Sequence, residues 1–224
     1  MSKKTRIFLI DDHPAMRHGI AQLVAKENDL EVCGEAGNRH ETLEAIKCTP
    51  PDFIVLDIAL KDPDRTGLDL ISEIHACVGP LPILIYSMHD EKIYAERALR
   101  AGARGYLMKQ EPVRRIIDAI RGIINDGIYV SETISLRILL KHFESPCESQ
   151  EPVTPEDCLS VREFEVFRLI GGGLQPREIA QKLCLSTKTV ETHRMNIRKK
   201  LGMANASEVT RYAVERSHMR HQTS

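Results

Sequence analysis

The sequence predicts an α/β fold, a doubly wound five-stranded parallel sheet, followed by a second, all-α domain of four helices. Residues 1–126 alternate five short apolar runs with five longer amphipathic segments, the order of a parallel sheet covered by helices on both faces. Two of the runs, FIVL and ILIY, are apolar at consecutive positions, as expected of central strands. Residues 159–224 contain helical patterns only.

The elements of the first half follow in order. The expected strands are residues 6–10, 31–36, 52–58, 83–87 and 105–108. The expected helices are residues 14–27, 38–48, 67–77, 90–101 and 112–125. Gly127 follows the last helix, at the position where a left-handed residue commonly ends one.

Polar side chains stand where four of these strands end. Asp11 and Asp12 follow the first strand, Asp57 lies near the end of the third, Ser87 ends the fourth and Lys109 follows the fifth. The carboxyl ends of parallel strands meet at one edge of a sheet, where ligands bind. Crowded carboxylates need a cation, and a set of oxygen ligands favours Mg²⁺.

A carboxylate beside Mg²⁺ is also a nucleophile for a phosphoryl group. The transferred group spreads negative charge over three oxygens, so a metal ion, an ammonium group and a hydroxyl group all stabilise it. Lys109 and Ser87 supply the last two. The edge therefore predicts phosphoryl chemistry.

Through these residues, the segment 1–126 resembles a response-regulator receiver domain. Such a domain has a flavodoxin-like (CheY-like) fold. The resemblance implies that Asp57 is the phosphoacceptor, Ser87 the switch hydroxyl and Lys109 the lysine that contacts the phosphoryl group. It implies Mg²⁺ at the acidic pair Asp11 and Asp12, at Asp57 and at the backbone carbonyl of Ala59. Tyr106 stands at the family's aromatic switch, which swings inward when Ser87 engages the phosphoryl group; a half-buried sheet aromatic is the alternative.

Three features depart from the family. Gly67 comes two residues later than is common after the phosphoacceptor, and the longer loop carries Asp62 and Asp64. Met88 follows Ser87 where a small residue is usual, and its bulk would hinder the phosphodonor or water. Gln110 follows Lys109 where many receivers have Pro. These departures bear on rates, because the reacting groups are all present.

Residues 127–158 are predicted to be a linker, first helical and then flexible and acidic. Residues 131–143 place Ile134, Ile138 and Leu139 at helical spacing, which indicates a short helix packing on one of the domains. Residues 144–158 contain three Pro and five acidic residues and almost nothing to bury. The acids either shield the basic segment that follows or simply keep the chain soluble.

Residues 159–224 are basic and predict four helices. They carry twelve Lys and Arg against six Asp and Glu, while the rest of the chain is acidic. Ser160 and Glu163 form a capping box, Gly171–Gly173 stop the first helix and Pro176 begins the second. Ser186 caps the next, on which Val190, Ile197 and Leu201 mark the core face. Two short helices across a tight turn, the second rich in cations, indicate a helix-turn-helix that binds double-stranded DNA.

This segment is similar to the LuxR-type DNA-binding domain of NarL/LuxR (FixJ) regulators, through LSVREFEVFRLI, EIAQKL, LSTKTVETH and NIRKKLG. From that resemblance we expect base contacts by Glu191, Thr192 and Met195. Phosphate contacts are expected from Lys188, Thr189, His193, Arg194, Asn196 and Lys199.

Together the domains predict a DNA-binding response regulator that a histidine kinase phosphorylates at Asp57, with Mg²⁺, and that works as a homodimer. One alternative is a DNA-binding regulator switched by a protein partner without phosphorylation. An enzyme using the same aspartates is disfavoured, because no second acid or base is placed for turnover. No apolar run is long enough to span a bilayer and no leader opens the chain, so we expect a cytoplasmic protein. Six scattered Cys predict neither a zinc site nor a disulfide framework.

Overall fold

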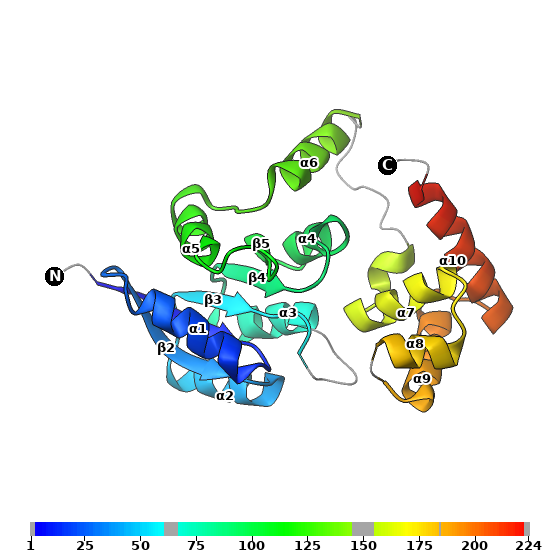
Figure 1. Cartoon of the computed structure of the whole chain (residues 1–224), viewed down its shortest axis with the longest axis horizontal. Helices are drawn as coiled ribbons and strands as arrows, with labels where there is room; N and C mark the ends of the chain where they lie inside the picture. The colour runs from blue at the N-terminus through cyan, green and yellow to red at the C-terminus, as the bar shows by residue number, and fades with distance from the viewer. Residues whose placement is uncertain (1–2, 61–66, 145–154, 184, 222–224) are drawn as a thin grey trace. The chain divides into compact units, whose positions relative to one another are not determined.

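Five parallel strands form one sheet in the order β2-β1-β3-β4-β5 (Figure 1). The structure is a computed structural model that describes residues 3–60, 67–144, 155–183 and 185–221. The chain forms two compact units, Met1–Glu148 and Ser149–Ser224, so the division falls within the predicted linker. The strands of the first unit are β1 Thr5–Ile10, β2 Leu30–Ala36, β3 Phe53–Leu56, β4 Ile83–Ser87 and β5 Gly105–Met108.

The helices of the first unit connect these strands in sequence and lie on both faces of the sheet. They are α1 Pro14–Val24, α2 Arg39–Cys48, α3 Gly67–Val78, α4 Glu91–Arg100 and α5 Arg115–Asp126. Gly127 ends α5 with a φ of 84°, which confirms the predicted left-handed cap. The predicted α/β class, with a five-stranded parallel sheet between helices, is confirmed.

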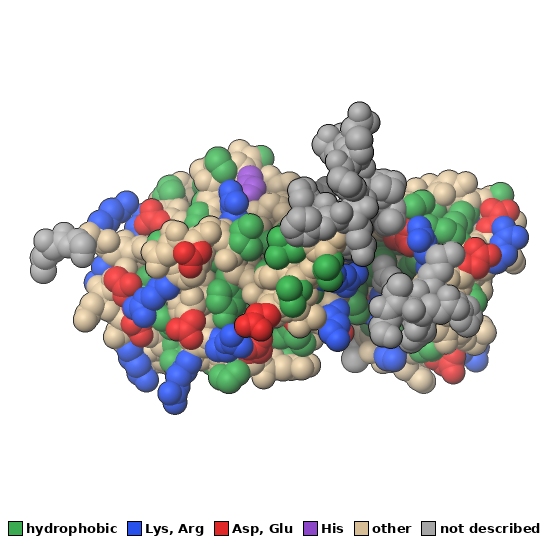
Figure 2. Space-filling model, turned by 90° about the horizontal axis from the view of Figure 1, so that it is seen from above, with side chains coloured by type: hydrophobic (Ala, Val, Ile, Leu, Met, Phe, Trp, Pro, Cys, Tyr) green, Lys and Arg blue, Asp and Glu red, His purple; other side chains and the backbone are tan. Residues whose placement is uncertain are grey.

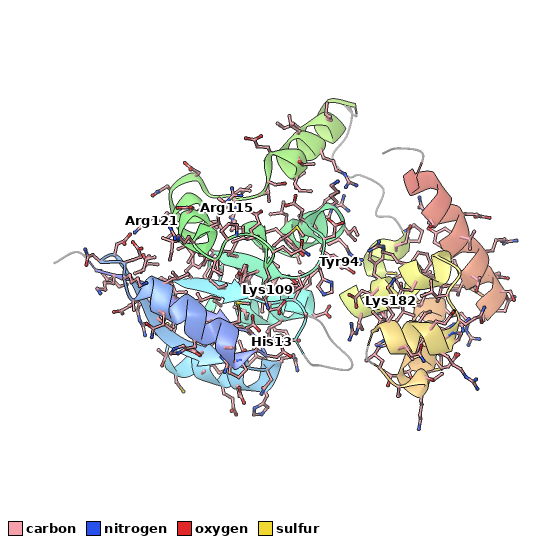
Figure 3. All side chains as sticks on the ribbon, viewed as in Figure 1. His13, Tyr94, Lys109, Arg115, Arg121 and Lys182 are labelled. Carbon is pink, nitrogen blue, oxygen red and sulfur yellow. The ribbon has the colours of Figure 1, made fainter. Side chains whose placement is uncertain are left out.

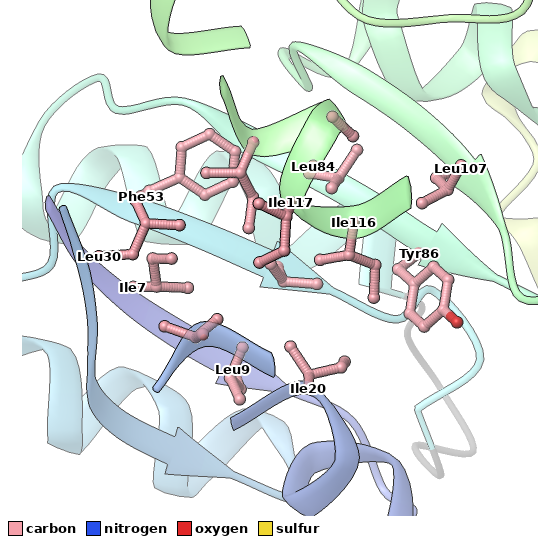
Figure 4. Packing of buried hydrophobic residues seen from close by; sticks show 14 of the residues in the cluster. Ile7, Leu9, Ile20, Leu30, Phe53, Leu84, Tyr86, Leu107, Ile116 and Ile117 are labelled. Atoms are coloured by element: carbon pink, nitrogen blue, oxygen red, sulfur yellow. The ribbon is translucent and has the colours of Figure 1, made fainter. Parts of the chain in front are cut away.

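Alternate residues of each strand face opposite sides of the sheet, which gives the unit two apolar layers. On one side, strand residues pack with Ile20 of α1 and Ile116 and Ile117 of α5 (Figure 4). Phe8 packs on the other side of the sheet, and a Cβ at Gly34 would lie only 2.4 Å from its ring. A glycine is therefore needed at position 34, where the β1–β2 register shifts.

Three predicted boundaries were wrong by a few residues. The first helix ends at Val24 rather than 27, because Lys26 and Glu27 turn back to Leu23 and Val24 in single-turn hydrogen bonds. The third strand is Phe53–Leu56, so Asp57 lies beyond its end. The fifth helix begins at Arg115, after a turn that starts at Pro112.

Helix α6, Glu132–Glu144, packs on α4 of the first unit. The Ser131 hydroxyl donates to Glu91 Oε1 (2.8 Å) and Arg137 donates to the Lys92 carbonyl (2.8 Å). Of the three predicted contact residues, Ile134 is buried, whereas Ile138 and Leu139 are 36% and 52% exposed.

On the face seen in Figure 2, hydrophobic side chains gather among interspersed acidic and basic ones.

The second unit is a bundle of helices around a small apolar core. Its helices are α7 Val161–Gly171, α8 Pro176–Lys182, α9 Thr187–Lys200 and α10 Ala206–His221, preceded by the 3₁₀ turn η1, Pro155–Cys158. The core includes Leu159, Phe164, Phe167, Ile170, Ile179, Val190, Ile197 and Val209. The Ser160–Glu163 capping box and the Ser186 cap are present as predicted.

Among the described residues of the acidic segment, Glu156 is buried, a contact that the sequence did not predict. Glu156 of η1 is 3% exposed, accepts from the Tyr212 hydroxyl (2.9 Å) and pairs with Arg216 (2.8 Å). A buried carboxylate is tolerated because both oxygens have donors.

Among the described residues, no helix is both long and apolar enough to cross a membrane.

Candidate functional site

The polar residues predicted at the strand ends come together at the carboxyl edge of the sheet. Asp11 follows β1, Asp57 follows β3, Ser87 ends β4 and Lys109 follows β5. Figure 3 shows His13 and Lys109 near the same edge, though 96 residues of sequence separate them. Asp11, Asp57 and Ser87 are 3%, 2% and 0% exposed. Their polar atoms are therefore held in a desolvated setting, where electrostatic effects are strong.

Lys109 binds two of the three carboxylates. Its Nζ lies 2.6 Å from Asp11 Oδ2 and 2.6 Å from Asp57 Oδ2, and its side chain is 3% exposed. Burial by itself lowers the pKa of an ammonium group, but Asp57 and Asp11 outweigh burial and hold the pKa of Lys109 above its ordinary value. The lysine is therefore a fixed positive charge beside Asp57.

The acidic pair, His13 and Asp57 form a donor set that fits a metal ion. One ligand atom from each of Asp11, Asp12, His13 and Asp57 lies within 4.8 Å of the others. Carboxylate oxygens suit Mg²⁺, so these residues fit the ion that the sequence predicted. The His13 Nδ1 atom lies 2.6 Å from Asp12 Oδ1 and 3.1 Å from Asp11 Oδ1.

The turn after β3 orients Asp57. The Ala59 amide donates to Asp57 Oδ1 (2.9 Å), which fixes the direction of the carboxylate. The Ala59 carbonyl as a metal ligand stays a prediction. Gly67 lies against the backbone of this turn. No side chain fits at this position, because a Cβ there would lie 2.5 Å from Ile58 Cα and 2.6 Å from the Asp57 carbonyl oxygen. Asp62 and Asp64 lie outside the described residues.

Ser87 and Tyr106 lie on adjacent strands, and both are buried. The Ser87 Oγ accepts from the His89 amide (3.4 Å), and the Tyr106 hydroxyl donates to the His89 carbonyl (2.9 Å). Burial raises the pKa of Tyr106 far above its ordinary value, so it stays a neutral donor. At 1% exposure Tyr106 is buried in this structure, whereas a half-buried sheet aromatic was the alternative.

Helix α9 exposes one face and buries the other. Lys188, Glu191, Thr192, Met195 and Lys199 are exposed, while Thr189, Arg194 and Asn196 are half-buried. Val190 and Ile197 are fully buried, as predicted, and Leu201 is half-buried. Arg194 lies 3.4 Å from Glu191, whereas Lys188 and Lys199 form no ion pair within the described part of the chain.

His193 differs from its prediction. The side chain is 5% exposed and lies on the buried side of α9 with Val190 and Ile197, so its ring faces the core. An imidazole in that position does not reach a phosphate on the outer side of the helix. We therefore remove His193 from the predicted phosphate contacts.

Two residues at the carboxyl edge escaped the sequence interpretation. His13 was visible beside Asp12 in the stretch IFLIDDHP, and its adjacency to the acidic pair was the available signal. Tyr86 stands beside Ser87, but nothing in the sequence distinguishes it from an ordinary core aromatic.

Comparisons with known proteins agree with this geometry. The model for the response regulator receiver domain matches residues 7–121, and that for bacterial regulatory proteins of the luxR family matches residues 157–213. This chain is a response regulator of the NarL/LuxR family. It is thus a DNA-binding regulator of a two-component system, and its family consists of transcription regulators rather than enzymes.

The matches of three similar proteins cover between 63% and 95% of this response regulator. Oxygen regulatory protein NreC of Staphylococcus aureus (strain JH9) is 32% identical over 212 residues, covering 94% of this chain and 97% of the relative. A two-component response regulator of the LuxR family from Aurantimonas sp. SI85-9A1 is 30% identical, with a TM-score of 0.56, covering 63% of this chain and 99% of that chain. RcsB of Salmonella enterica serovar Typhimurium, bound to promoter rprA with the phosphomimetic BeF₃⁻, has a TM-score of 0.56 at 23% identity, covering 95% and 99%. At that identity the RcsB likeness concerns the fold alone.

Proposed function

We propose that a histidine kinase phosphorylates this regulator at Asp57 and that the phosphoryl group controls DNA binding by α9. The observation that carries the proposal is Lys109 Nζ at 2.6 Å from Asp57 Oδ2, which sets a fixed cation beside a buried carboxylate. In the transfer, an Asp57 oxygen attacks phosphorus and the bond from phosphorus to the kinase imidazole nitrogen breaks. The products are an aspartyl phosphate and, once the released ring nitrogen takes a proton from water, a neutral histidine.

Asp12, Asp57 and the Ala59 carbonyl would hold Mg²⁺, with Asp11 in support. When bound, the ion neutralises negative charge on the phosphoryl oxygens. Lys109 supplies a second positive charge and Ser87 a hydroxyl donor. Asp11 keeps Lys109 in place, because Nζ also lies 2.6 Å from Asp11 Oδ2.

The proposed switch runs from Ser87 through His89 to Tyr106. His89 binds both residues, since its amide donates to Ser87 Oγ and its carbonyl accepts from Tyr106. Moving Ser87 toward a phosphoryl oxygen would therefore shift the backbone that holds Tyr106. We propose that this shift favours a receiver surface for dimerisation or releases the DNA-binding unit.

The DNA interface is proposed to be the outer face of α9. Lys188, Thr189, Arg194, Asn196 and Lys199 would contact phosphates, and Glu191, Thr192 and Met195 would contact bases. A homodimer is proposed because two recognition helices on paired half-sites gain affinity and specificity together.

One observation favours a second candidate, a regulator that a protein partner switches without phosphorylation. Tyr106 is buried with its hydroxyl donating to the His89 carbonyl, which is the inward position that the switch would take. A receiver fixed in this state would not need phosphorylation to adopt it. The intact set Asp57, Ser87 and Lys109 favours the first candidate.

The test is the intact-protein mass after incubation with acetyl phosphate, with and without Mg²⁺. We expect a Mg²⁺-dependent gain of one phosphoryl group that Asp57→Asn abolishes. DNA affinity of the same samples should rise with the modified fraction. DNA binding at full strength without modification, equal in Asp57→Asn, would select the partner-switched candidate.

A further inference from the structure

Tyr86 has a buried hydroxyl next to the site. The residue lies on β4 immediately before Ser87, and its side chain points to the opposite face of the sheet, among the residues of α1 and α5. Tyr86 is 1% exposed, and among the described residues its hydroxyl has no hydrogen-bond partner. In Figure 4 the hydroxyl oxygen points away from the other labelled side chains.

Water does not satisfy this hydroxyl. Tyr86 lines a small internal space together with Asp11, Arg17, Asp57 and apolar residues, and that space is too narrow for a water molecule. A buried donor without a partner destabilises a fold, and phenylalanine would pack there without this penalty. The hydroxyl therefore calls for a partner in another state of the protein.

Asp11 is the acceptor that such a state would offer. The Lys109 Nζ lies 5.9 Å from the centre of the Tyr86 ring, and Asp11 lines the same internal space as Tyr86. Asp11 Oδ1 already accepts from the His13 amide (2.8 Å), while Oδ2 accepts from Lys109 (2.6 Å). Oδ2 is therefore the oxygen that depends on Lys109.

A phosphoryl group on Asp57 changes this pairing. Its oxygens carry more negative charge than one carboxylate oxygen, and they attract Lys109 from Asp11. The Asp11 side chain is only 5% exposed, so solvent does not replace the lost donor. Asp11, which lines the same space as Tyr86, would then have an oxygen that has lost its ammonium donor.

We propose that Tyr86 is a positioning residue of the phosphorylated site, whose hydroxyl donates to Asp11 Oδ2 when Lys109 turns to the phosphoryl group. The hydroxyl is unpaired before phosphorylation and paired after it, so it stabilises the phosphorylated state alone. This inference rests on the proposed function at Asp57.

The first test compares Tyr86→Phe with wild type by calorimetric titration of BeF₃⁻ in saturating Mg²⁺. We expect affinity to fall about tenfold, as for a lost hydrogen bond to a charged group. Affinity for Mg²⁺ alone should change less than about twofold, because Lys109 then still binds Asp11. Tyr129→Phe makes the same chemical change against the same apolar cluster, beside the first residue of β5, and should leave both affinities unchanged.

The second test observes the wild-type hydroxyl directly. Infrared spectra of ring-labelled tyrosine, with Tyr86→Phe subtracted, should show the Tyr86 C–O stretch shift to a hydrogen-bond donor position when BeF₃⁻ binds. A hydroxyl that already donates without BeF₃⁻, or equal BeF₃⁻ affinities for wild type and Tyr86→Phe, would overturn the role of Tyr86. A wild-type protein that binds no BeF₃⁻ would overturn this role and the proposed function together.

Discussion

The carboxyl edge of the sheet and the outer face of α9 both concentrate charge, but they hold it differently. At the edge, the side chains of Lys109, Asp11 and Asp57 are at most 5% exposed, and Lys109 binds each of the two carboxylates at 2.6 Å. On α9, Lys188 and Lys199 are exposed, and within the described residues neither forms an ion pair. One region consists of buried partners and the other of exposed cations.

The difference follows from the ligands. A single phosphoryl group is stabilised best by donors that are already in position in a low-dielectric site. Water there does not weaken the electrostatic interaction, and the donors need not reorganise. A DNA backbone needs many cations that exchange counterions for phosphates, and these work best in water. Substitutions of the buried edge residues should therefore change folding stability, and substitutions on the outer face of α9 should change only DNA binding.

The largest expected effect tests the buried side of this comparison. Lys109→Met should lower the free energy of unfolding by about 3–5 kcal/mol, because it leaves Asp11 and Asp57 buried without their cation. Urea denaturation at low Mg²⁺ measures this. Mg²⁺ should stabilise the variant more than wild type, since the ion replaces the missing charge.

Lys47→Met is the matched control, because Lys47 is exposed on α2. It should change stability by less than about 0.5 kcal/mol. Equal stability of the two variants would mean that the buried ion pairs contribute nothing, and the comparison would fail at its first step.

His193→Ala tests an exception, a buried residue on the exposed helix. Its 5% exposed ring packs beside Val190 and Ile197, so the variant should lose about 2 kcal/mol of stability. The salt dependence of DNA binding should not change, since the ring contacts no phosphate. Thermal unfolding and DNA titrations over a range of salt concentrations measure the two quantities. A reduced salt slope with unchanged stability would restore His193 to the phosphate contacts.

On the exposed face, Lys188→Ala and Lys199→Ala should weaken binding to all DNA sequences by similar factors. Each should reduce the slope of log affinity against log salt by about 0.9, the share of one phosphate contact. Thr192→Ala should instead alter sequence preference and leave the slope unchanged. Fluorescence anisotropy on specific and scrambled duplexes distinguishes these outcomes, and identical behaviour of all three variants would refute the division into phosphate and base contacts.

Much of the fold could be predicted because the residues that determine it are periodic or local. The consecutive apolar residues of β3 and β4 and the caps at Ser160 and Ser186 act within a few positions of the chain. The convergence of Asp11, Asp57, Ser87 and Lys109 followed from a general property of parallel sheets. That step did not require knowing in which direction any side chain points.

What the sequence did not predict depends on side-chain direction across elements. His193 carries the same periodic signal as its neighbours, and only the packing of α9 puts its ring inside. Tyr86 looks like a core aromatic, and only the space it shares with Asp11 gives its hydroxyl a role. Glu156 lies in an acidic, Pro-rich stretch, and its burial requires Tyr212 and Arg216 from 56 and 60 residues later.

The smallest expected effect lies where the two kinds of region meet, at an exposed residue beside the buried site. Met88 is 60% exposed and follows Ser87, so Met88→Ala should change stability by less than about 0.5 kcal/mol. Removing its bulk should speed phosphoryl gain from acetyl phosphate and loss to water. A flexible side chain moves aside, so we expect a rate change below about tenfold, or about 1.4 kcal/mol of activation free energy.

Met195→Ala, an exposed methionine of α9, is the matched control and should leave both rates unchanged. Time-resolved intact-mass spectra of the two variants and wild type give the rates. If Met88→Ala matches wild type, access to Asp57 is not limited by this side chain. The longer loop that ends at Gly67 would then be the remaining departure beside the phosphoacceptor, and shortening it by two residues would be the next change to make.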